Sequence, residues 1–287
     1  DNMQLPVRMW LPKNAPKSII VALHGFNDYS LFFESSAQPL TTQGIASFAY
    51  DQRGFGQAPN TGIWAGAHTM ARDLIEFIRL IKKRHPNTPL YLLGESMGGA
   101  VVMVAMTQPQ APMVNGIILA APAVWGASTM PWYQRWALTL GSYTLPWLKL
   151  SPNGLKIKAS DNIAMLKKLG RDPLIIKETR IDAMHGLTQL MSLALERSNK
   201  LQENTLILYG ELDEVIPKSP TSKMLQRLPK NAATRQKIAL YEKGYHMLLR
   251  GLNAHLPQQD ILAWMHNSNQ PLPSGADLRP IVKLIPL

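Results

Sequence analysis

The sequence contains no cysteine, so disulfide bonds, thiol nucleophiles and thiolate metal sites are all excluded. It also lacks the His-Glu-x-x-His pair of zinc peptidases, the glycine-lysine signature of nucleotide-binding P-loops and the glycine fingerprint of dinucleotide-binding folds. We therefore expect no metal and no organic cofactor. No apolar run reaches the length of about 18 residues that crosses a bilayer. Any catalysis is therefore expected to rely on side chains other than cysteine, without a metal or a cofactor.

Acidic residues are scarce relative to basic ones, since 30 lysines and arginines stand against 19 aspartates and glutamates, a formal net charge of +11. A basic exterior favours anionic partners. The charge is scattered, and its densest clusters, Lys82–Arg84 and Lys167-Lys168, are typical of solvated helix ends. We therefore expect peripheral contact with anionic membranes and no nucleic acid. The lack of cysteine and of an initial methionine favours an exported protein, periplasmic or membrane-anchored, over a cytoplasmic one. No pattern specifies an oligomeric state.

Apolar runs typical of strands buried on both faces alternate with amphipathic helix patterns along the 287 residues. The expected strands span 6–11, 18–23, 45–50, 90–93, 116–121, 205–209 and 237–241. One helix is expected from Met70 to Ile81, with Thr69 as its cap and Pro86 beyond its end. Two further prolines, Pro220 and Pro257, are expected in the first turns of later helices. This alternation predicts an α/β fold with a mostly parallel central sheet and helices on both faces.

The alternation is interrupted by residues 123–202, which separate the expected strands 116–121 and 205–209. We expect a helical lid here, over the carboxyl edge of a core formed by 1–122 and 203–287. The segment holds four of the seven tryptophans, at positions 125, 132, 136 and 147. Two interpretations remain open: they form a small apolar core of the lid itself, or some of them line an acyl pocket or dock on a lipid surface. The proline-rich tail from residue 268 is expected to run extended along the surface.

One serine stands in a setting that exposes and activates a hydroxyl group. The stretch Gly94-Glu95-Ser96-Met97-Gly98 directly follows the strand-like run 90–93 and leads into small apolar residues. A Gly-x-Ser-x-Gly motif between a strand and a helix is typical of a nucleophile elbow, a sharp turn that strains the serine and requires glycine on both sides. The helix that follows would direct its N-terminal dipole at the reacting oxygen. We predict that Ser96 is the nucleophile.

A serine nucleophile needs a histidine base and an acid that orients it, here in the chain order serine, acid, histidine. Asp213 follows the expected strand 205–209, and His246 follows the expected strand 237–241. Because the carboxyl ends of parallel strands meet at one edge of the sheet, we expect both beside Ser96. Other candidates for the acid and the base are less well placed: Glu211, Glu214, His255 and His266.

Acyl transfer also needs backbone amides that bind the negative charge on the attacked carbonyl oxygen. Met97 directly follows the nucleophile and supplies one amide, and Phe26, in the loop after strand 18–23, matches the other. His24 begins that loop and is expected to shape it rather than to act as the base. We also regard His24, Gly25 and Trp125 as candidate substrate contacts.

Five motifs, HGFND (24–28), DQRGFG (51–56), GESMGG (94–99), GELDEVIP (210–217) and GYHMLL (244–249), resemble the α/β-hydrolase superfamily. The likeness is to the branch of monoacylglycerol lipases and lysophospholipases, the serine aminopeptidase S33-type hydrolases, and it covers residues 5–267. The resemblance implies a triad of Ser96, Asp213 and His246, oxyanion amides at 26 and 97, and a mobile apolar lid that admits one acyl chain. The shared loop 51–54 we interpret as a turn held by Asp51 and Arg53. The chain departs from lipase relatives at positions 26 and 27, where they often carry small residues and a further glycine.

These observations together predict a serine hydrolase that cleaves esters of single-acyl lipids through an acyl-enzyme. An aminopeptidase or amidase on the same scaffold is the alternative, although it would need an acidic pocket for the substrate ammonium group. Acids are few in the lid: Asp161, Asp172, Glu178, Asp182 and Glu196. A binding protein that kept the fold and lost turnover is the other alternative, and an intact triad argues against it.

Overall fold

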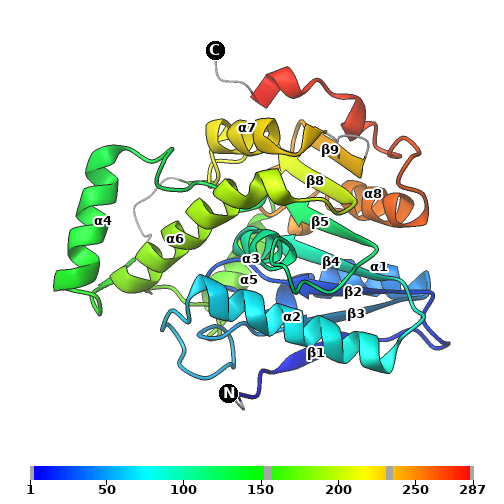
Figure 1. Cartoon of the computed structure of the whole chain (residues 1–287), viewed down its shortest axis with the longest axis horizontal. Helices are drawn as coiled ribbons and strands as arrows, with labels where there is room; N and C mark the ends of the chain where they lie inside the picture. Colours follow the sequence, from blue (N-terminus) through cyan, green and yellow to red (C-terminus); the bar gives the residue numbers. More distant parts are fainter. Residues whose placement is uncertain (1–2, 152–156, 231–234, 285–287) are drawn as a thin grey trace.

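A mostly parallel sheet forms the centre of the protein, as the alternating sequence pattern predicts. The computed structural model describes residues 3–151, 157–230 and 235–284, and Figure 1 shows its arrangement. The strands follow the order β1-β3-β2-β4-β5-β8-β9, and every neighbouring pair is parallel except β1 with β3. Their bounds are β1 Val7–Trp10, β2 Ser18–Leu23, β3 Ile45–Tyr50, β4 Leu90–Glu95, β5 Gly116–Ala120, β8 Thr205–Gly210 and β9 Gln236–Tyr241. Each expected strand is confirmed, with its ends shifted by at most two residues.

Helices cover both faces of this sheet, because successive strand side chains point to opposite sides. In β2, Ile19 and Val21 belong to one apolar cluster and Ile20 and Ala22 to another. Each cluster is completed by its own helical layer. The helices are α2 (Ala67–Arg84), α3 (Met97–Met106), α6 (Ile181–Arg197) and α7 (Lys218–Arg227) on one face, and α1 (Glu34–Thr42) and α8 (His255–His266) on the other. The prolines at 220 and 257 lie in the first turns of α7 and α8, as expected.

The start of α2 differs from the sequence-based expectation. The helix begins at Ala67 rather than Met70, and Gly66, with a φ of 92°, precedes it. The amide of Met70 donates to the carbonyl of Gly66 at 3.1 Å, so Thr69 lies inside the first turn and the expected cap at Thr69 is wrong. The end agrees better, since α2 stops at Arg84 before Pro86, with its basic cluster in the last turn.

Residues 123–202, expected as a lid, divide into two parts. α4 (Trp132–Thr144) has no buried residue and stands away from the sheet in Figure 1. It is followed by a two-stranded ribbon of β6 (Lys149–Leu150) and β7 (Thr179–Arg180), with α5 (Ile163–Arg171) between them in the chain. α6 instead packs on α3, and its Leu190 and Ala194 are fully buried. That this segment opens and closes over the sheet stays a prediction.

The tryptophans of this segment do not form a core of their own. The exposed fractions of Trp132, Trp136 and Trp147 are 69%, 65% and 61%. Trp132 makes an edge-on ring contact with its chain neighbour Tyr133, at a centroid distance of 6.2 Å. Trp125 is half-buried against the main core. The interpretation of a private apolar core is therefore wrong for these three residues, and the interpretation of docking or pocket-lining side chains remains.

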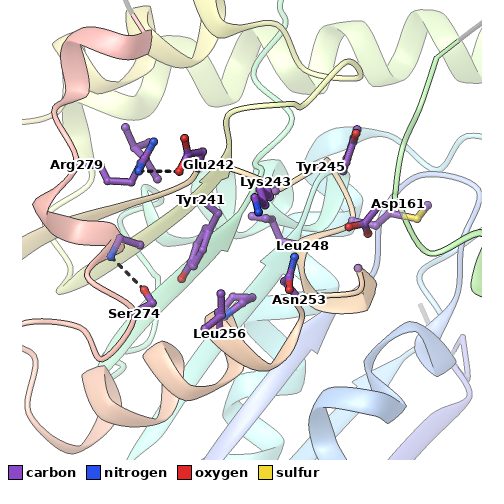
Figure 2. Close-up of a pocket in the computed structure, with 16 residues that line it drawn as sticks. Asp161, Tyr241, Glu242, Lys243, Tyr245, Leu248, Asn253, Leu256, Ser274 and Arg279 are labelled. Atoms are coloured by element: carbon purple, nitrogen blue, oxygen red, sulfur yellow. Dashed lines mark hydrogen bonds and ion pairs between the residues drawn. The ribbon is translucent and has the colours of Figure 1, made fainter.

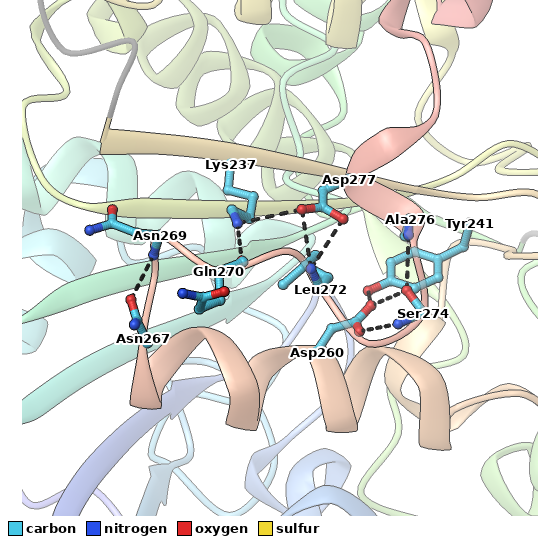
Figure 3. A network of polar contacts seen from close by, with 10 residues as sticks. All are labelled: Lys237, Tyr241, Asp260, Asn267, Asn269, Gln270, Leu272, Ser274, Ala276 and Asp277. Carbon is cyan, nitrogen blue, oxygen red and sulfur yellow. Dashed lines mark hydrogen bonds and ion pairs between the residues drawn. The ribbon is translucent and has the colours of Figure 1, made fainter.

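The C-terminal tail is anchored rather than simply extended. Figure 3 shows Asp260 of α8 accepting hydrogen bonds from the hydroxyl of Tyr241 at 2.7 Å and the amide of Ser274 at 3.0 Å. Lys237 of β9 contacts Asp277 at 3.4 Å. After α8 the tail forms two 3-10 turns, η5 (Ala276–Leu278), which contacts β9, and η6 (Ile281–Leu284), which contacts α7. In the described part of the chain, no helix combines the length and the apolar character that a bilayer crossing requires.

Candidate active site

Ser96 lies at a strained turn between β4 and α3. Its φ is 54° and its ψ is −115°, a region that side chains other than glycine rarely occupy. The flanking glycines are required by space: a methyl carbon at Gly94 would lie 2.5 Å from the carbonyl carbon of Gly98, and one at Gly98 would lie 2.3 Å from the carbonyl oxygen of Leu23. The turn therefore has the strained backbone and the flanking glycines of a nucleophile elbow, and the role of Ser96 as the nucleophile stays a prediction.

The backbone around Ser96 is fixed on both sides. Its amide donates to the carbonyl of Ala120 at 3.0 Å, and its carbonyl accepts from the amides of Ala123 and Ala100 at 2.9 and 3.2 Å. The hydroxyl stays accessible because the Ser96 side chain is only half-buried. A methyl carbon at Gly25 would lie 4.0 Å from Ser96 Oγ. The loop after β2 thus reaches the nucleophile, where the expected oxyanion amide of Phe26 is needed.

His246 and Asp213, which are separated by 33 residues in the chain, are in direct contact. His246 Nδ1 lies 2.8 Å from Asp213 Oδ2, and both side chains are buried. The other carboxylate oxygen, Oδ1, accepts from the amides of Val215 and Ile216 at 2.8 and 2.9 Å. Since Oδ2 is an acceptor, Nδ1 is the protonated nitrogen, and Nε2 is left free to take a proton. β4, β8 and β9 are parallel, so this pair and Ser96 lie at one edge of the sheet.

The competing acids and bases are engaged elsewhere. Glu211 pairs with Arg279 at 2.8 Å, and Glu214 accepts the amide of Lys158 at 2.7 Å. His255 and His266 form the two ends of α8. Asp213 is therefore the carboxylate that meets the histidine.

The acid-bearing and histidine-bearing loops are built against each other. The amide of Leu212 donates to the carbonyl of Gly244 at 2.9 Å, and that of Glu211 donates to the carbonyl of Tyr241 at 2.9 Å. A cavity of about 350 Å³ lies beside the histidine loop, and Figure 2 shows Leu248 and the tail residue Ser274 in its wall. The histidine loop thus rests on the strands on one side and borders a hollow on the other.

His24 has a structural role in the loop after β2, residues 24–28, which carries the expected oxyanion amide of Phe26 and is called the oxyanion loop below. Its ring is fully buried, Nδ1 lies 2.8 Å from the carbonyl of Gly25, and Nε2 accepts the amide of Gln52 at 3.0 Å. Burial lowers the pKa of His24 below its usual value, and the charge of Arg250 acts in the same direction. Because both ring nitrogens are used inside the fold, His24 shapes the loop as expected. Its candidate role as a substrate contact is not supported, since the ring has no exposed surface.

The neighbouring turn 51–57 is structural, as interpreted from the sequence. Asp51 accepts the amides of Ser30 and Gln57 at 2.9 and 2.8 Å, and Arg53 contacts Asp73 at 2.6 Å. Gln52 of this turn contacts the start of the loop after β2, because its amide donates to His24 Nε2 at 3.0 Å and its side chain donates to the carbonyl of His24 at 2.9 Å.

Trp125 lies just beyond β5 and packs part of its ring on the main core. Its indole nitrogen donates to the carbonyl of Thr129 at 3.4 Å. Its contact with substrate stays a prediction, as does that of Gly25.

Three residues of the site were given no structural role from the sequence: Asn27, Glu95 and Arg250. Asn27 has a φ of 64°, its carbonyl accepts the amide of Ile176 at 3.1 Å, and its side chain donates to Thr179 at 2.7 Å. Glu95 and Arg250 are buried and paired at 2.6 Å. The sequence shows a carboxylate, Glu95, directly before Ser96 and an arginine, Arg250, four residues after His246. No sequence pattern predicts that these two residues pair.

Comparisons with known proteins point to one family of hydrolases. A profile of the family described as "Serine aminopeptidase, S33" matches residues 14–253. The chain is 27% identical to the monoglyceride lipase of Homo sapiens over 255 residues, covering 88% of this chain and 82% of the relative. It is 25% identical to the monoacylglycerol lipase of Mycolicibacterium smegmatis over 276 residues, covering 90% and 91%.

Solved structures share the fold at lower sequence identity. The monoacylglycerol lipase of Paleococcus ferrophilus is 20% identical with a TM-score of 0.75, over 93% of this chain and 100% of that one. A soluble variant of the monoglyceride lipase of Saccharomyces cerevisiae, solved with a substrate analog, is 20% identical with a TM-score of 0.78, over 94% and 93%. The central sheet and its two helical layers are therefore an α/β-hydrolase fold.

Proposed function

The chain belongs to the serine aminopeptidase S33 family of hydrolases, and on that premise we propose that it cleaves the ester bond of a single-acyl lipid, a monoacylglycerol or a lysophospholipid. Its lipase relatives make it a carboxylic ester hydrolase. One observation carries the finer proposal: the 2.8 Å contact between His246 and Asp213 is made at the sheet edge where Ser96 turns at a φ of 54°. This is the arrangement that a serine nucleophile requires.

In the proposed reaction, His246 Nε2 accepts the Ser96 proton while Oγ attacks the ester carbonyl. Asp213 holds the Nδ1–H tautomer and stabilises the imidazolium that forms. The imidazolium then gives its proton to the leaving alcohol, which yields the acyl-enzyme. Water, deprotonated by His246, attacks this ester and releases the fatty acid. The mechanism calls for no metal and no organic cofactor.

The amides of Phe26 and Met97 are proposed to bind the oxyanion. Met97 is the first residue of α3, and the first amides of a helix have no acceptor within that helix. The α3 dipole also favours negative charge at this end. Loss of one such donor costs about 2.7–4 kcal/mol of transition-state stabilisation.

The test is a hydrolysis profile of wild type and Ser96→Ala across monoacylglycerols, lysophospholipids, short p-nitrophenyl esters and aminoacyl anilides. We expect wild type to favour the single-acyl lipids and Ser96→Ala to lose activity by several orders of magnitude. An alkyl fluorophosphonate should label wild type and leave Ser96→Ala unlabelled. Preferred cleavage of anilides would support the aminopeptidase alternative instead, and an unlabelled wild type would support a binding protein.

We also propose that α4 and the segment after it rest on an anionic lipid surface. Trp132, Trp136 and Leu140 recur at helical spacing along α4 and are exposed by 69%, 65% and 65%. Exposed apolar stripes of this kind suit the interface between headgroups and acyl chains. Every charged residue from 123 to 171 other than Asp161 is a lysine or arginine. The apolar stripe and the positive charge thus favour the same partner.

Vesicle co-sedimentation tests this docking. We expect the protein to bind phosphatidylglycerol vesicles more than phosphatidylcholine vesicles, and to be partly released when salt rises from about 0.05 M to about 0.5 M. The variant Trp132→Ser/Trp136→Ser should bind less. Met113→Ser is the matched control, because Met113 is 85% exposed but lies in the loop before β5, at the opposite edge of the sheet. Equal recovery of wild type in the supernatant under all conditions would refute the proposal.

A further inference from the structure

A buried arginine joins two carboxylates beside the nucleophile. Arg250 Nη2 lies 2.6 Å from Glu95 Oε1 and 2.7 Å from Asp28 Oδ2. All three side chains are at least nine-tenths buried. Burial works against the charge of Arg250, but the two carboxylates outweigh it and raise its pKa, so the guanidinium stays charged.

Each member of this cluster belongs to a different part of the proposed machinery. Glu95 is the last residue of β4 and directly precedes Ser96. Arg250 ends the short turn η4 (Leu248–Arg250), which begins two residues after His246, and its amide donates to the carbonyl of Met247 at 3.1 Å. One guanidinium nitrogen therefore connects the elbow to the histidine loop.

The third member extends the connection to the oxyanion loop. Asp28 lies two residues after Phe26, and its Oδ1 accepts the amide of Tyr29 at 2.8 Å. Its other oxygen, Oδ2, meets Arg250. The lid segment reaches the same arginine, since the side chain of Asn162 donates to the carbonyl of Arg250 at 3.0 Å.

The pairing geometry is not the one that would maximise stability. Arginine and carboxylate pair most strongly through two parallel hydrogen bonds. Here a single nitrogen serves both acids, and in the described part of the chain Glu95 Oε2 and Arg250 Nε are buried without a hydrogen-bond partner. A buried ion cluster is weak evidence for stability, and in some proteins such clusters are retained for the arrangement they impose. The arrangement imposed here is the mutual placement of three loops.

We propose that Arg250 is a positioning residue that fixes the elbow, the histidine loop and the oxyanion loop relative to one another. The inference rests on the proposed function, because the three loops matter together only if Ser96, His246 and the amide of Phe26 act in one reaction. Arg250 touches neither substrate nor the reacting atoms in this role. It acts through the backbone segments that its neighbours occupy.

The single bridging nitrogen gives a specific expectation for substitutions. A lysine ammonium can contact two carboxylates with one nitrogen, so Arg250→Lys should keep most of the bridge. Arg250→Met keeps much of the volume and removes the bridge. A misplacement of about 1 Å at a reacting group can cost about 10²-fold in rate. We therefore expect Arg250→Met to react with the fluorophosphonate about 10²-fold more slowly than wild type at saturating probe. Arg250→Lys should react at least about tenfold faster than Arg250→Met.

The experiment measures the labelling rate of Ser96 at saturating probe together with thermal unfolding followed by circular dichroism. Arg250→Met leaves two buried acids without a cation and therefore risks misfolding. The variant Asp28→Asn/Glu95→Gln/Arg250→Met is made beside it, because replacing a whole buried ion cluster by neutral residues is often well tolerated. It should fold and still label slowly. Lys237→Met is the control, because it removes another partly buried ion pair, with Asp277, at the amino end of β9 and away from His246, and should lower the unfolding temperature without slowing labelling.

Slow labelling by every bridge-free variant that folds, with recovery in Arg250→Lys, supports the proposal. Labelling of a folded bridge-free variant within about threefold of wild type overturns it, because loss of the bridge would then leave the loops in place. A lysine variant no faster than the methionine variant also overturns it. Wild type that is labelled but leaves monoacylglycerols and lysophospholipids uncleaved refutes the proposed substrate alone. Wild type that is not labelled overturns both.

Discussion

Replacing Gly210 by alanine should slow the reaction at Ser96, although residue 210 carries no reactive group. Gly210 ends β8, and a methyl carbon there would lie 2.3 Å from the carbonyl oxygen of Gly244, 2.5 Å from its carbonyl carbon and 2.8 Å from the carbonyl oxygen of Tyr245. All three atoms are backbone atoms, so no side-chain rotation relieves the overlap. They belong to the segment that leads directly into His246.

The size of the effect follows from these distances. Non-bonded atoms need about 3.4 Å, so the segment 244–245 must retreat by about 1 Å. A displacement of that size at a catalytic group can cost about 10²-fold in rate, and overpacking of this kind costs about 1–3 kcal/mol of stability. The loss should appear in kcat more than in KM, because the shift moves the base rather than the acyl site.

The assay is ester hydrolysis by Gly210→Ala, with the free energy of unfolding taken from urea titration. Gly170→Ala is the matched control: a methyl carbon at Gly170 meets nothing within 4 Å, and alanine is the better helix former by about 1 kcal/mol. It should be at least as stable as wild type and equally active. A folded Gly210→Ala with wild-type kcat would refute the reasoning, because His246 would then not depend on the packing of 244–245.

Three further outcomes are expected. The pKa of His24 is lowered in the folded state, so the unfolded chain binds more protons as the pH drops below about 6.5. The free energy of unfolding should therefore fall by up to about 1.4 kcal/mol per pH unit in that range. Urea titrations of His24→Gln should show much less of this pH dependence. Asn27→Ala and Asn27→Gly both lose the bond to Thr179, but only alanine is strained by the positive φ, so the free energy of unfolding of Asn27→Ala should be lower than that of Asn27→Gly by about 1 kcal/mol. A methyl carbon at Gly186 would lie 2.2 Å from the Trp64 ring, so differential scanning calorimetry of Gly186→Ala should show a loss of about 1–3 kcal/mol.

The sequence predicted the fold well because buried parallel strands leave a strong local signal. Runs such as 18–23 and 205–209 are apolar throughout, and each became a strand with little change in its bounds. The start of α2 was missed because the backbone conformation of Gly66 determines it. The positive φ of Gly66 ends the preceding loop, and the helix begins at the next residue. Local preferences at Thr69 could not reveal it.

The candidate site was predicted where single residues follow strands and missed where distant residues meet. Asp213 and His246 each stand just past a strand, so topology alone brings them together. The pairing of Glu95 with Arg250 joins residues 155 positions apart, and only the folded loops make it visible. The tryptophans of α4 show a different limit. Their hydrophobicity predicts that these side chains are buried. It does not predict whether the rest of the chain provides a surface that buries them, and here they are exposed.

The path of the tail has a consequence for how the molecule meets other copies of itself. Leu272 and Ala276 pack in the cluster on the α8 side, whereas Leu284 packs with Leu240 on the other side, so the chain wraps around the outer strand β9. An uncovered outer strand is a template for edge-to-edge pairing between molecules. On the lipid surface proposed above, neighbouring molecules would meet at high local density. The wrapped strand would then keep β9 from pairing with the sheet of a neighbouring molecule at this end.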